Sequence, residues 1–363
     1  MGDIVFPQKS NFSAQMRGCS PYLLFDTLLG ALGVQAGLSR IVNAGAGRTP
    51  VDELSMWDLK AMLDDLGVRC EGMSVPAENI DLLPIPAMAQ IIHSKGPEFV
   101  VLLEASREAA TFFSCESGLE TCDSESFLRR WCGPVLVPRE VRAISEDESL
   151  RTATEEESQR NEFLSSVRTV DDFLTPQECA ELIAVSSRHW EPSRVGARHS
   201  YGRVSSYRTS RSAELGETEH RELNERIAHR AGEIVPGILA EHVEKLQCVS
   251  YAEHQEFKPH YDIDNTGDNR HRLWTVLVYL NDGFEGGETC FPLVDLKVRP
   301  KAGMALVFAN RLASGAMNAF ALHAGLPVTS GAKYACNIWI SGPAVANAGP
   351  AEHATHELVG EHA

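Results

Sequence analysis

The residues best suited to chemistry are His260 and Asp262, which lie two positions apart in the β-like stretch 257–263. Alternate side chains of a strand point to the same face, so this histidine and this carboxylate can bind one metal ion together. His323, far downstream, is the candidate for a third ligand. Two histidines and one carboxylate on one side of an ion leave other coordination positions open, and this ligand set is typical of non-haem Fe(II) centres.

The chain around these ligands has the composition of short strands separated by turns. From residue 246 onward, apolar stretches alternate with glycine-containing turns, and the clearest predicted strands are 247–251, 273–280, 304–308 and 334–340. Many short strands of this kind predict an antiparallel sandwich or jelly roll. We expect the metal ligands to lie in the mouth of such a barrel.

Two helices and one long loop are expected before these strands. Thr175, Pro176 and Glu178 have the types and spacing of a helix start with a capping box. A second, amphipathic helix is predicted around residues 219–234. Between them, the arginine-rich stretch 194–211 is too polar for a core and too long for a tight turn, so we predict a substrate-facing lid, with a solvated basic loop as the alternative.

A series of short motifs runs through residues 170–341 in a fixed order. They are Arg208-Thr209-Ser210, Pro259-His260-Tyr261-Asp262, Tyr279-Leu280-Asn281, Gly286-Gly287-Glu288-Thr289 and His323-Ala324-Gly325, followed by Lys333 and Trp339-Ile340. In this order and spacing they resemble the prolyl 4-hydroxylase branch of the 2-oxoglutarate/Fe(II) dioxygenases. The resemblance implies a double-stranded β-helix, or jelly roll, with flanking helices.

The resemblance also implies the cofactors and the residues that hold them. Fe(II) would be bound by the two histidines and the aspartate already described. 2-Oxoglutarate would be held by Lys333, whose charge suits a carboxylate, and by Tyr251 and Thr289. O2 would be the second cosubstrate, and ascorbate is a candidate reductant.

Other matched positions concern the substrate. Arg272 matches an arginine near the substrate mouth and is the candidate catalytic residue, and Arg208 and Trp339 are candidates for substrate binding. Phe257 stands where peptidyl prolyl hydroxylases often carry a tyrosine, and Ser341 stands where a basic residue is common. These two departures leave iron chemistry intact and put proline as the target in doubt.

The first 140 residues are of a different kind, with helical patterns at 22–32 and 50–66 and strand patterns at 85–92, 99–104 and 110–113. This order indicates an α+β unit. Leu32-Gly33, Pro84-Ile85-Pro86-Ala87, Phe99-Val100-Val101-Leu102 and Trp131-Cys132-Gly133 resemble the papain-like C39 peptidase domain, over residues 14–138.

The catalytic positions implied by that resemblance are all substituted. The position of the nucleophilic cysteine holds Ser20, with Cys19 one residue early, and the position of the histidine holds Glu98. His93 lies further upstream, and no aspartate lies near Ser114. A thiolate needs a base and an orienting group, so we expect no peptidase activity. A peptide-binding groove without chemistry and a purely structural module both remain open.

The bulk composition limits the partners. The chain has 363 residues, nine cysteines and a formal net charge of -17. The charge argues against nucleic-acid binding. No apolar run has membrane-spanning length, and irregularly spaced cysteines argue against a disulfide framework, so we expect a cytoplasmic protein with no membrane contact. The oligomeric state is not indicated.

We therefore predict residues 1–140 as a catalytically inactive C39-like domain, 141–162 as an acidic linker, flexible or loosely helical, 163–343 as the dioxygenase domain and 344–363 as a flexible tail. The predicted reaction is hydroxylation of an amino-acid residue, with proline as a candidate, in a peptide or protein that the N-terminal domain could bind. The main alternative is a dioxygenase acting on a free amino acid or another small metabolite. A non-enzymatic binding protein is disfavoured by the complete ligand set.

Overall fold

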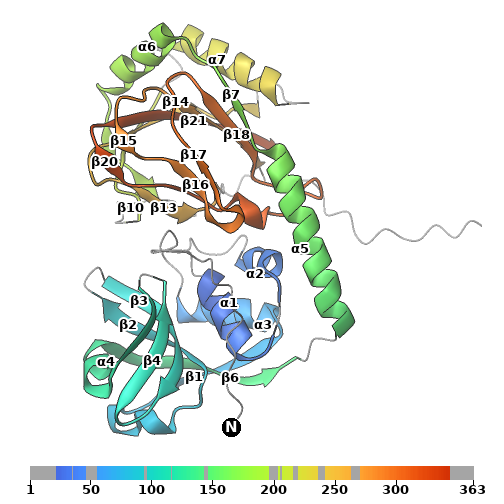
Figure 1. Ribbon diagram of the computed structural model, residues 1–363, viewed down its shortest axis with the longest axis vertical. Helices are drawn as coiled ribbons and strands as arrows, with labels where there is room; N and C mark the ends of the chain where they lie inside the picture. Colours follow the sequence, from blue (N-terminus) through green and yellow to red (C-terminus); the bar gives the residue numbers. More distant parts are fainter. Residues whose placement is uncertain are drawn as a thin grey trace, which may run out of the picture.

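A computed structural model describes residues 22–34, 36–45, 55–93, 96–115, 117–142, 146–195, 203–204, 207–215, 220–235, 242–262 and 270–343. These residues form an N-terminal region, 22–142, and a C-terminal region, 146–343 (Figure 1). The predictions for Cys19, Ser20, the tail and much of the 194–211 stretch lie outside the described residues.

The N-terminal region packs helices on a six-stranded antiparallel sheet of order β1-β6-β2-β3-β4-β5. Its strands are β1 (Val68–Ser74), β2 (Ala87–His93), β3 (Gly96–Ala105), β4 (Ala109–Ser114), β5 (Gly118–Asp123) and β6 (Trp131–Val141). On one face lie α1 (Tyr22–Ala31), α2 (Leu38–Gly45) and α3 (Met56–Asp65), and on the other lie η3 (Ala77–Leu82) and α4 (Ser124–Arg130). Each face has its own apolar cluster, because side chains alternate along the strands.

The sequence predicted α1, β2, β3 and β4 close to their observed positions. The prediction that the next helix starts near residue 50 was wrong for α3, which starts at Met56 because Ser55 and Asp58 form a capping box there. Neither α2 nor the edge strands β1 and β5 nor the inner strand β6 were predicted. α2, β1 and β5 are short, and β6 contains two prolines, which are uncommon within strands.

The predicted linker is largely a single helix, α5 (Glu146–Ser166), which runs along both regions (Figure 1). The helix contains no glycine or proline, and six of its 21 residues are glutamate, which favours helices. Its C-terminal end is anchored by Phe163, which is fully buried with its ring 5.3 Å from that of Phe291. Nearer its start, Glu156 accepts a hydrogen bond from the backbone N–H of Leu38 in α2.

The C-terminal region has two main sheets. A seven-stranded sheet has the order β7-β18-β14-β21-β12-β11-β8, and a four-stranded sheet has the order β13-β19-β16-β17. The first contains β7 (Arg168–Val170), β8 (Glu191–Pro192), β11 (Arg211–Glu214), β12 (Gln247–Tyr251), β14 (Arg270–Tyr279), β18 (Ala305–Ala309) and β21 (Lys333–Pro343). The second contains β13 (Phe257–His260), β16 (Thr289–Phe291), β17 (Leu296–Val298) and β19 (His323–Gly325). Two short pairs, β9 (Arg194–Val195) with β10 (Arg203–Val204) and β15 (Glu285–Gly286) with β20 (Val328–Ser330), lie beside them.

Because side chains alternate along a strand, the two faces of the large sheet pack in different clusters. On β14, Val276 and Val278 point toward α6 (Pro176–Ser186) and α7 (Arg221–Ile234), which cover the outer face. The alternate residues Leu277 and Tyr279 point toward the small sheet and pack in a second cluster between the two sheets. The candidate site lies on this inner side, and the predicted capping box of α6 is present.

The two regions share one apolar cluster. Met317 and Ala319 come from the C-terminal region, are 3% and 0% exposed, and pack with α1, α2 and α3. Tyr261 is partly buried against the same cluster, and α2 lies against η6 (Ala319–Ala321). The N-terminal helices therefore face the side of the C-terminal region that carries β13 (Figure 1).

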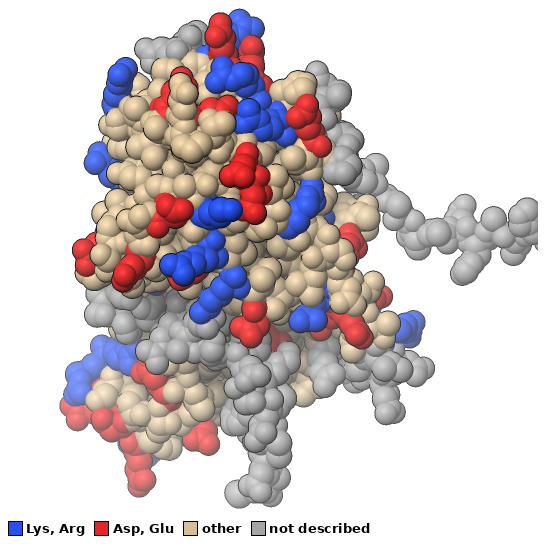
Figure 2. All heavy atoms as spheres, turned by 45° about the horizontal axis from the view of Figure 1, so that its top comes forward, with Lys and Arg blue, Asp and Glu red and all other residues tan. Residues whose placement is uncertain are grey.

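The charge is distributed without large areas of one sign on the face drawn in Figure 2. There, lysine and arginine side chains lie next to aspartate and glutamate side chains over the C-terminal region. Among the described residues, no two of the eight cysteines form a disulfide. In the same part of the chain, every helix is too short or too polar to reach across a bilayer.

Candidate metal centre

The three predicted metal ligands come together at the paired strands β13 and β19. His260 and His323 are direct partners in the strand register, and Asp262 follows two residues after the first histidine. Their ligating atoms all lie within 4.8 Å of one another. The Nε2 atoms of His260 and His323 lie 3.7 and 3.6 Å from the two carboxylate oxygens of Asp262. The donor set is thus assembled on one side of a common point.

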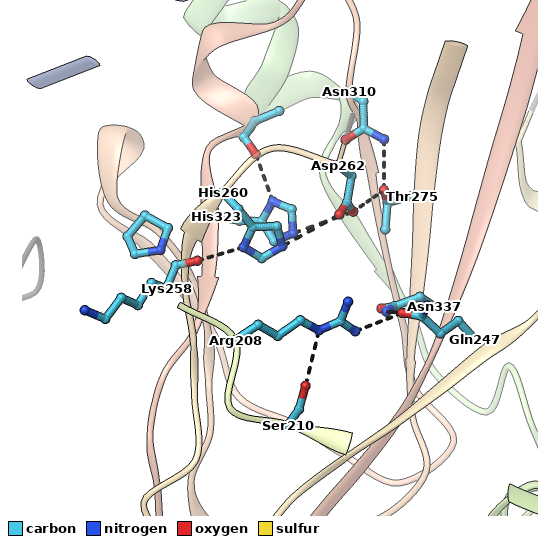
Figure 3. A network of polar contacts seen from close by, with 12 residues as sticks. Arg208, Ser210, Gln247, Lys258, His260, Asp262, Thr275, Asn310, His323 and Asn337 are labelled. Atoms are coloured by element: carbon cyan, nitrogen blue, oxygen red, sulfur yellow. Dashed lines mark hydrogen bonds and ion pairs between the residues drawn. The ribbon is translucent and has the colours of Figure 1, made fainter. Parts of the chain in front are cut away.

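Backbone carbonyls fix the orientation of both imidazoles. Nδ1 of His260 lies 2.8 Å from the carbonyl oxygen of Lys258, and Nδ1 of His323 lies 3.0 Å from that of Ala321 (Figure 3). A carbonyl only accepts, so each Nδ1 carries the proton and donates it. Each Nε2 is then left with a free lone pair, which is the form that binds a metal.

The carboxylate is held from the large sheet. Thr275 on β14 donates its hydroxyl proton to Oδ2 of Asp262 over 2.7 Å, and Nδ2 of Asn310 donates to the Thr275 hydroxyl over 2.9 Å (Figure 3). Both supporting residues are buried. Neither was predicted, because the pairing of distant strands decides which inward side chain meets the aspartate.

The protonation states suit a divalent cation. Burial, and then the neighbouring His323, lower the pKa of His260 to about 3. Burial alone would raise the pKa of Asp262, but His323, His260 and Arg272 together with the Thr275 hydrogen bond hold it at about 2. At neutral pH the site therefore offers neutral imidazole and an ionised carboxylate, the forms that metal binding requires. This donor set fits Fe(II).

Lys333 is a buried cation beside the same cluster between the two sheets that His323 contacts. It is 3% exposed, pairs with Tyr251 in the strand register, and donates from Nζ to the carbonyl of Gly287 over 2.7 Å. Within the described part of the chain, no carboxylate lies at ion-pair distance from it. Burial lowers its pKa to about 8. Because a buried charge without an opposite partner is costly, this position fits an anionic ligand.

The walls around Lys333 are aromatic and hydroxylic. Its Nζ lies 5.4 and 5.5 Å from the ring centroids of Tyr251 and Tyr279. The Tyr279 hydroxyl donates to Oγ1 of Thr289 over 2.7 Å. Burial raises the pKa of both tyrosines, so their hydroxyls stay protonated. Gly287 approaches closely with a φ of +68°, and a Cβ there would lie 3.1 Å from the lysine side chain. Tyr251 and Thr289 were predicted from sequence to hold 2-oxoglutarate, which stays a prediction, and Tyr279 was assigned no role.

Arg272 on β14 and Trp339 on the neighbouring strand β21 lie together. The guanidinium carbon of Arg272 is 3.6 Å from the centroid of the indole ring. The same guanidinium makes three hydrogen bonds of 2.8 to 3.1 Å to Glu244, which also accepts from the Ser341 hydroxyl. Glu244 was not predicted and had no recognisable signal in sequence. The Arg272 guanidinium directs three hydrogen bonds to the Glu244 carboxylate. A contact between Arg272 and a substrate therefore stays a prediction.

Arg208 is buried, which corrects the expectation that the 194–211 stretch is too polar for a core. It is 6% exposed and donates to Ser210 Oγ over 3.2 Å and to Gln247 Oε1 over 2.8 Å (Figure 3). Its guanidinium carbon lies 4.7 Å from the ring centroid of Phe257, which in turn stacks on His260 at 3.4 Å between centroids. Neutral acceptors and an aromatic face make this burial tolerable.

The chain is similar in sequence to known 2-oxoglutarate/Fe(II) oxygenases. The profile of the 2OG-Fe(II) oxygenase superfamily matches residues 246–341. Probable prolyl 4-hydroxylase 10 of Arabidopsis thaliana is 33% identical over 193 residues, covering 47% of this chain and 66% of that protein. Probable prolyl 4-hydroxylase 3 of the same plant is 31% identical over 196 residues, covering 47% of this chain and 67% of that protein. The chain belongs to the prolyl 4-hydroxylase family of 2-oxoglutarate/Fe(II) oxygenases, which use Fe(II), 2-oxoglutarate and O2.

Among solved structures, the 2OG complex of viral collagen prolyl hydroxylase from Paramecium Bursaria Chlorella virus-1 is 29% identical, with a TM-score of 0.40. It covers 49% of this chain and 96% of that chain. A double glycine motif protease from an AMS/PCAT transporter, solved with a leader peptide, is 17% identical over 33% of this chain, with a TM-score of 0.28. The C39-like assignment of the N-terminal region stays a prediction.

Two of the substituted peptidase positions can be located in the N-terminal region. The hydroxyl of Ser114 donates to Oε1 of Glu98 over 2.7 Å. The positions matched to the family's histidine and aspartate are therefore adjacent in space, but they carry a carboxylate and a hydroxyl. Neither group can generate a thiolate as a histidine does.

Proposed function

We propose that this protein hydroxylates an amino-acid residue, in the first place proline, within a peptide or protein, with 2-oxoglutarate and O2 as cosubstrates. The observation that supports this most is that the His260–Asp262–His323 donor set and Lys333, which has no carboxylate partner among the described residues, both border the cluster between the two sheets of the C-terminal region. The plant relatives, of which the chain spans about two thirds, are named as prolyl 4-hydroxylases.

Bound iron with 2-oxoglutarate supplies the oxidising chemistry that inserts one oxygen atom of O2 into a C–H bond, while the other enters succinate as CO2 is released. The chain's own residues prepare that chemistry. The two histidines and Asp262 would hold the metal on one side, and Thr275 keeps the carboxylate aimed at it. Fixed ligands of this kind need no rearrangement when the metal is bound.

The cosubstrate would be oriented from its far end. Lys333 would pair with the distal carboxylate, and Tyr251 and Thr289 would donate hydrogen bonds to it. Because these groups are 2 to 7% exposed, water is excluded and the charge pairing is strengthened. Arg208 and Trp339 would contact the substrate beside the metal. Arg272, whose guanidinium lies over the indole ring of Trp339, would be the catalytic residue at the same place.

Each of the two regions would be one domain. The two sheets of the C-terminal region would form the jelly roll, and the N-terminal region would be a C39-like domain without peptidase activity that binds the substrate peptide. α5 would then connect the two domains rigidly. The cytoplasmic location stays a prediction from the cysteine pattern.

A small-molecule substrate is the second candidate, and two positions favour it. Phe257 has no hydroxyl group and stacks on His260. The Ser341 hydroxyl already donates a hydrogen bond to Glu244. Neither side chain is therefore placed to hydrogen-bond a peptide backbone. A free amino acid would need fewer such contacts.

The identity of the hydroxylated product distinguishes a peptide substrate from a small-molecule substrate. Enzyme loaded with Fe(II) would be given 2-oxoglutarate, isotopically labelled O2, and either proline-containing peptides or free amino acids. We expect one labelled oxygen atom on a prolyl residue of a peptide, located by fragmentation in a mass spectrometer. Label found only in a free amino acid would replace the peptide proposal with the alternative.

A further inference from the structure

The N-terminal region touches the segment that holds the metal ligands. Met317 and Ala319 precede His323 by a few residues and are buried among the side chains of α1, α2 and α3. η6 (Ala319–Ala321) begins within this contact, and α2 lies against it. The packing of the N-terminal helices thus reaches Ala319, four residues before His323.

Two direct connections lead from η6 to the histidines. The hydroxyl of Tyr261, which lies between His260 and Asp262 in the chain, donates to the carbonyl of Ala319 over 2.8 Å. At the other end of η6, the carbonyl of Ala321 accepts from Nδ1 of His323 over 3.0 Å. A shift of this short helix would displace the two carbonyl groups that accept hydrogen bonds from Tyr261 and from His323.

A third connection reaches the carboxylate. Asn318, 0% exposed, caps η6 by accepting from the N–H of Phe320 over 3.1 Å. Its own N–H donates to the carbonyl of Asn310 over 3.0 Å. The Asn310 side chain in turn donates to Thr275, which holds Asp262. Each of the three ligands is therefore linked to η6 by hydrogen bonds or chain continuity.

We propose that the N-terminal region is a positioning part of the metal centre: by packing α2 against η6 it fixes the segment that orients His260, Asp262 and His323. This role is separate from substrate binding, and it holds whatever the substrate of the proposed hydroxylation is. Under this proposal Ile41 of α2 and Tyr261, which follows β13, are positioning residues, although neither offers a ligand to the metal. Supporting groups of this kind typically contribute 10- to 100-fold to metal affinity.

The test uses the full-length protein and Co(II), whose visible absorption reports binding at the site without turnover. Ile41 and Ile91 are both fully buried in the N-terminal region, but only Ile41 lies in the cluster shared with Met317 and Ala319. We expect Ile41→Ala to raise the Kd for Co(II) by roughly 10-fold and Ile91→Ala to leave it unchanged. Equal Kd values for the two variants would overturn the proposal.

A milder pair removes single hydroxyl groups. Tyr261→Phe deletes the donor to Ala319, while Tyr334→Phe alters a half-buried tyrosine that packs in the outer cluster of the large sheet. We expect weaker Co(II) binding only for Tyr261→Phe. An unchanged Kd in both would contradict the proposed connection through η6.

A measurement on the unmodified protein avoids any question of folding. Coupling between two parts of a protein is reciprocal, so bound Co(II) must also stabilise the contact with α2. Hydrogen exchange with and without Co(II) should show added protection in Leu38–Gly45 as well as around η6. Protection confined to the C-terminal region would overturn the proposal, and neither result depends on whether any peptide is hydroxylated.

Discussion

At the scale of single residues, Lys333 makes the most specific prediction. Replacing it by Met removes a charge-assisted hydrogen bond to the distal carboxylate, worth about 1.5 to 3 kcal/mol. We expect the KM for 2-oxoglutarate to rise roughly 10- to 100-fold. Lys301→Met, at an exposed lysine paired with Asp171, is the matched control and should leave KM unchanged. An unchanged KM in Lys333→Met would show that the anion lies elsewhere.

The same residue predicts a pH dependence. Burial lowers the pKa of Lys333 to about 8 before the anion binds. Below that pH the ammonium is already formed, and above it the proton must be taken up on binding. The KM for 2-oxoglutarate should therefore be flat up to about pH 8 and rise above it, while Lys333→Met should lack this rise. A flat wild-type profile through pH 9 would contradict the assignment.

The sequence predicted the His-Asp-His donor set that the structure brings together and missed the residues that hold it in place. His260 and Asp262 were predictable because a two-residue spacing on a strand decides their common face. Thr275, Asn310 and Glu244 depend on which distant strands become neighbours, and a single sequence carries little information on that pairing.

At the scale of secondary-structure elements, α5 is the part whose role differs most from expectation. Its sequence is acidic, yet Phe163 inserts between the sheets of the C-terminal region. Phe163→Ala should lower the free energy of unfolding by about 3 to 5 kcal/mol, as is usual for a buried phenylalanine. Chemical denaturation would measure this change.

The control for that prediction lies on the same helix. Glu157 is exposed, and its replacement by Ala should change stability by less than about 0.5 kcal/mol. Equal stability of the Phe163→Ala and Glu157→Ala variants would mean that α5 is only a connector. The acidic composition predicted an exposed segment correctly for most of α5 but could not show that one aromatic residue anchors it.

At the scale of the whole molecule, the two regions are coupled through a common core. The sequence predicted two domains from the change in composition near residue 140, but it could not show their contact. Met317 and Ala319 are apolar residues in the C-terminal region whose partners lie more than 200 residues earlier in the chain. Removing the N-terminal region would expose them, so point substitutions in the full-length protein separate substrate binding from support of the metal site more cleanly than truncation does.

The most direct test of the account is succinate formation from 2-oxoglutarate by Fe(II)-loaded, full-length protein exposed to O2 with proline-containing peptides. The wild type would be compared with His260→Ala, which removes one ligand of the donor set. We predict that a peptide stimulates succinate formation in the wild type and that His260→Ala abolishes it. Iron-loaded wild type that forms no more succinate than the variant with any peptide in the panel would contradict the proposed peptide hydroxylase.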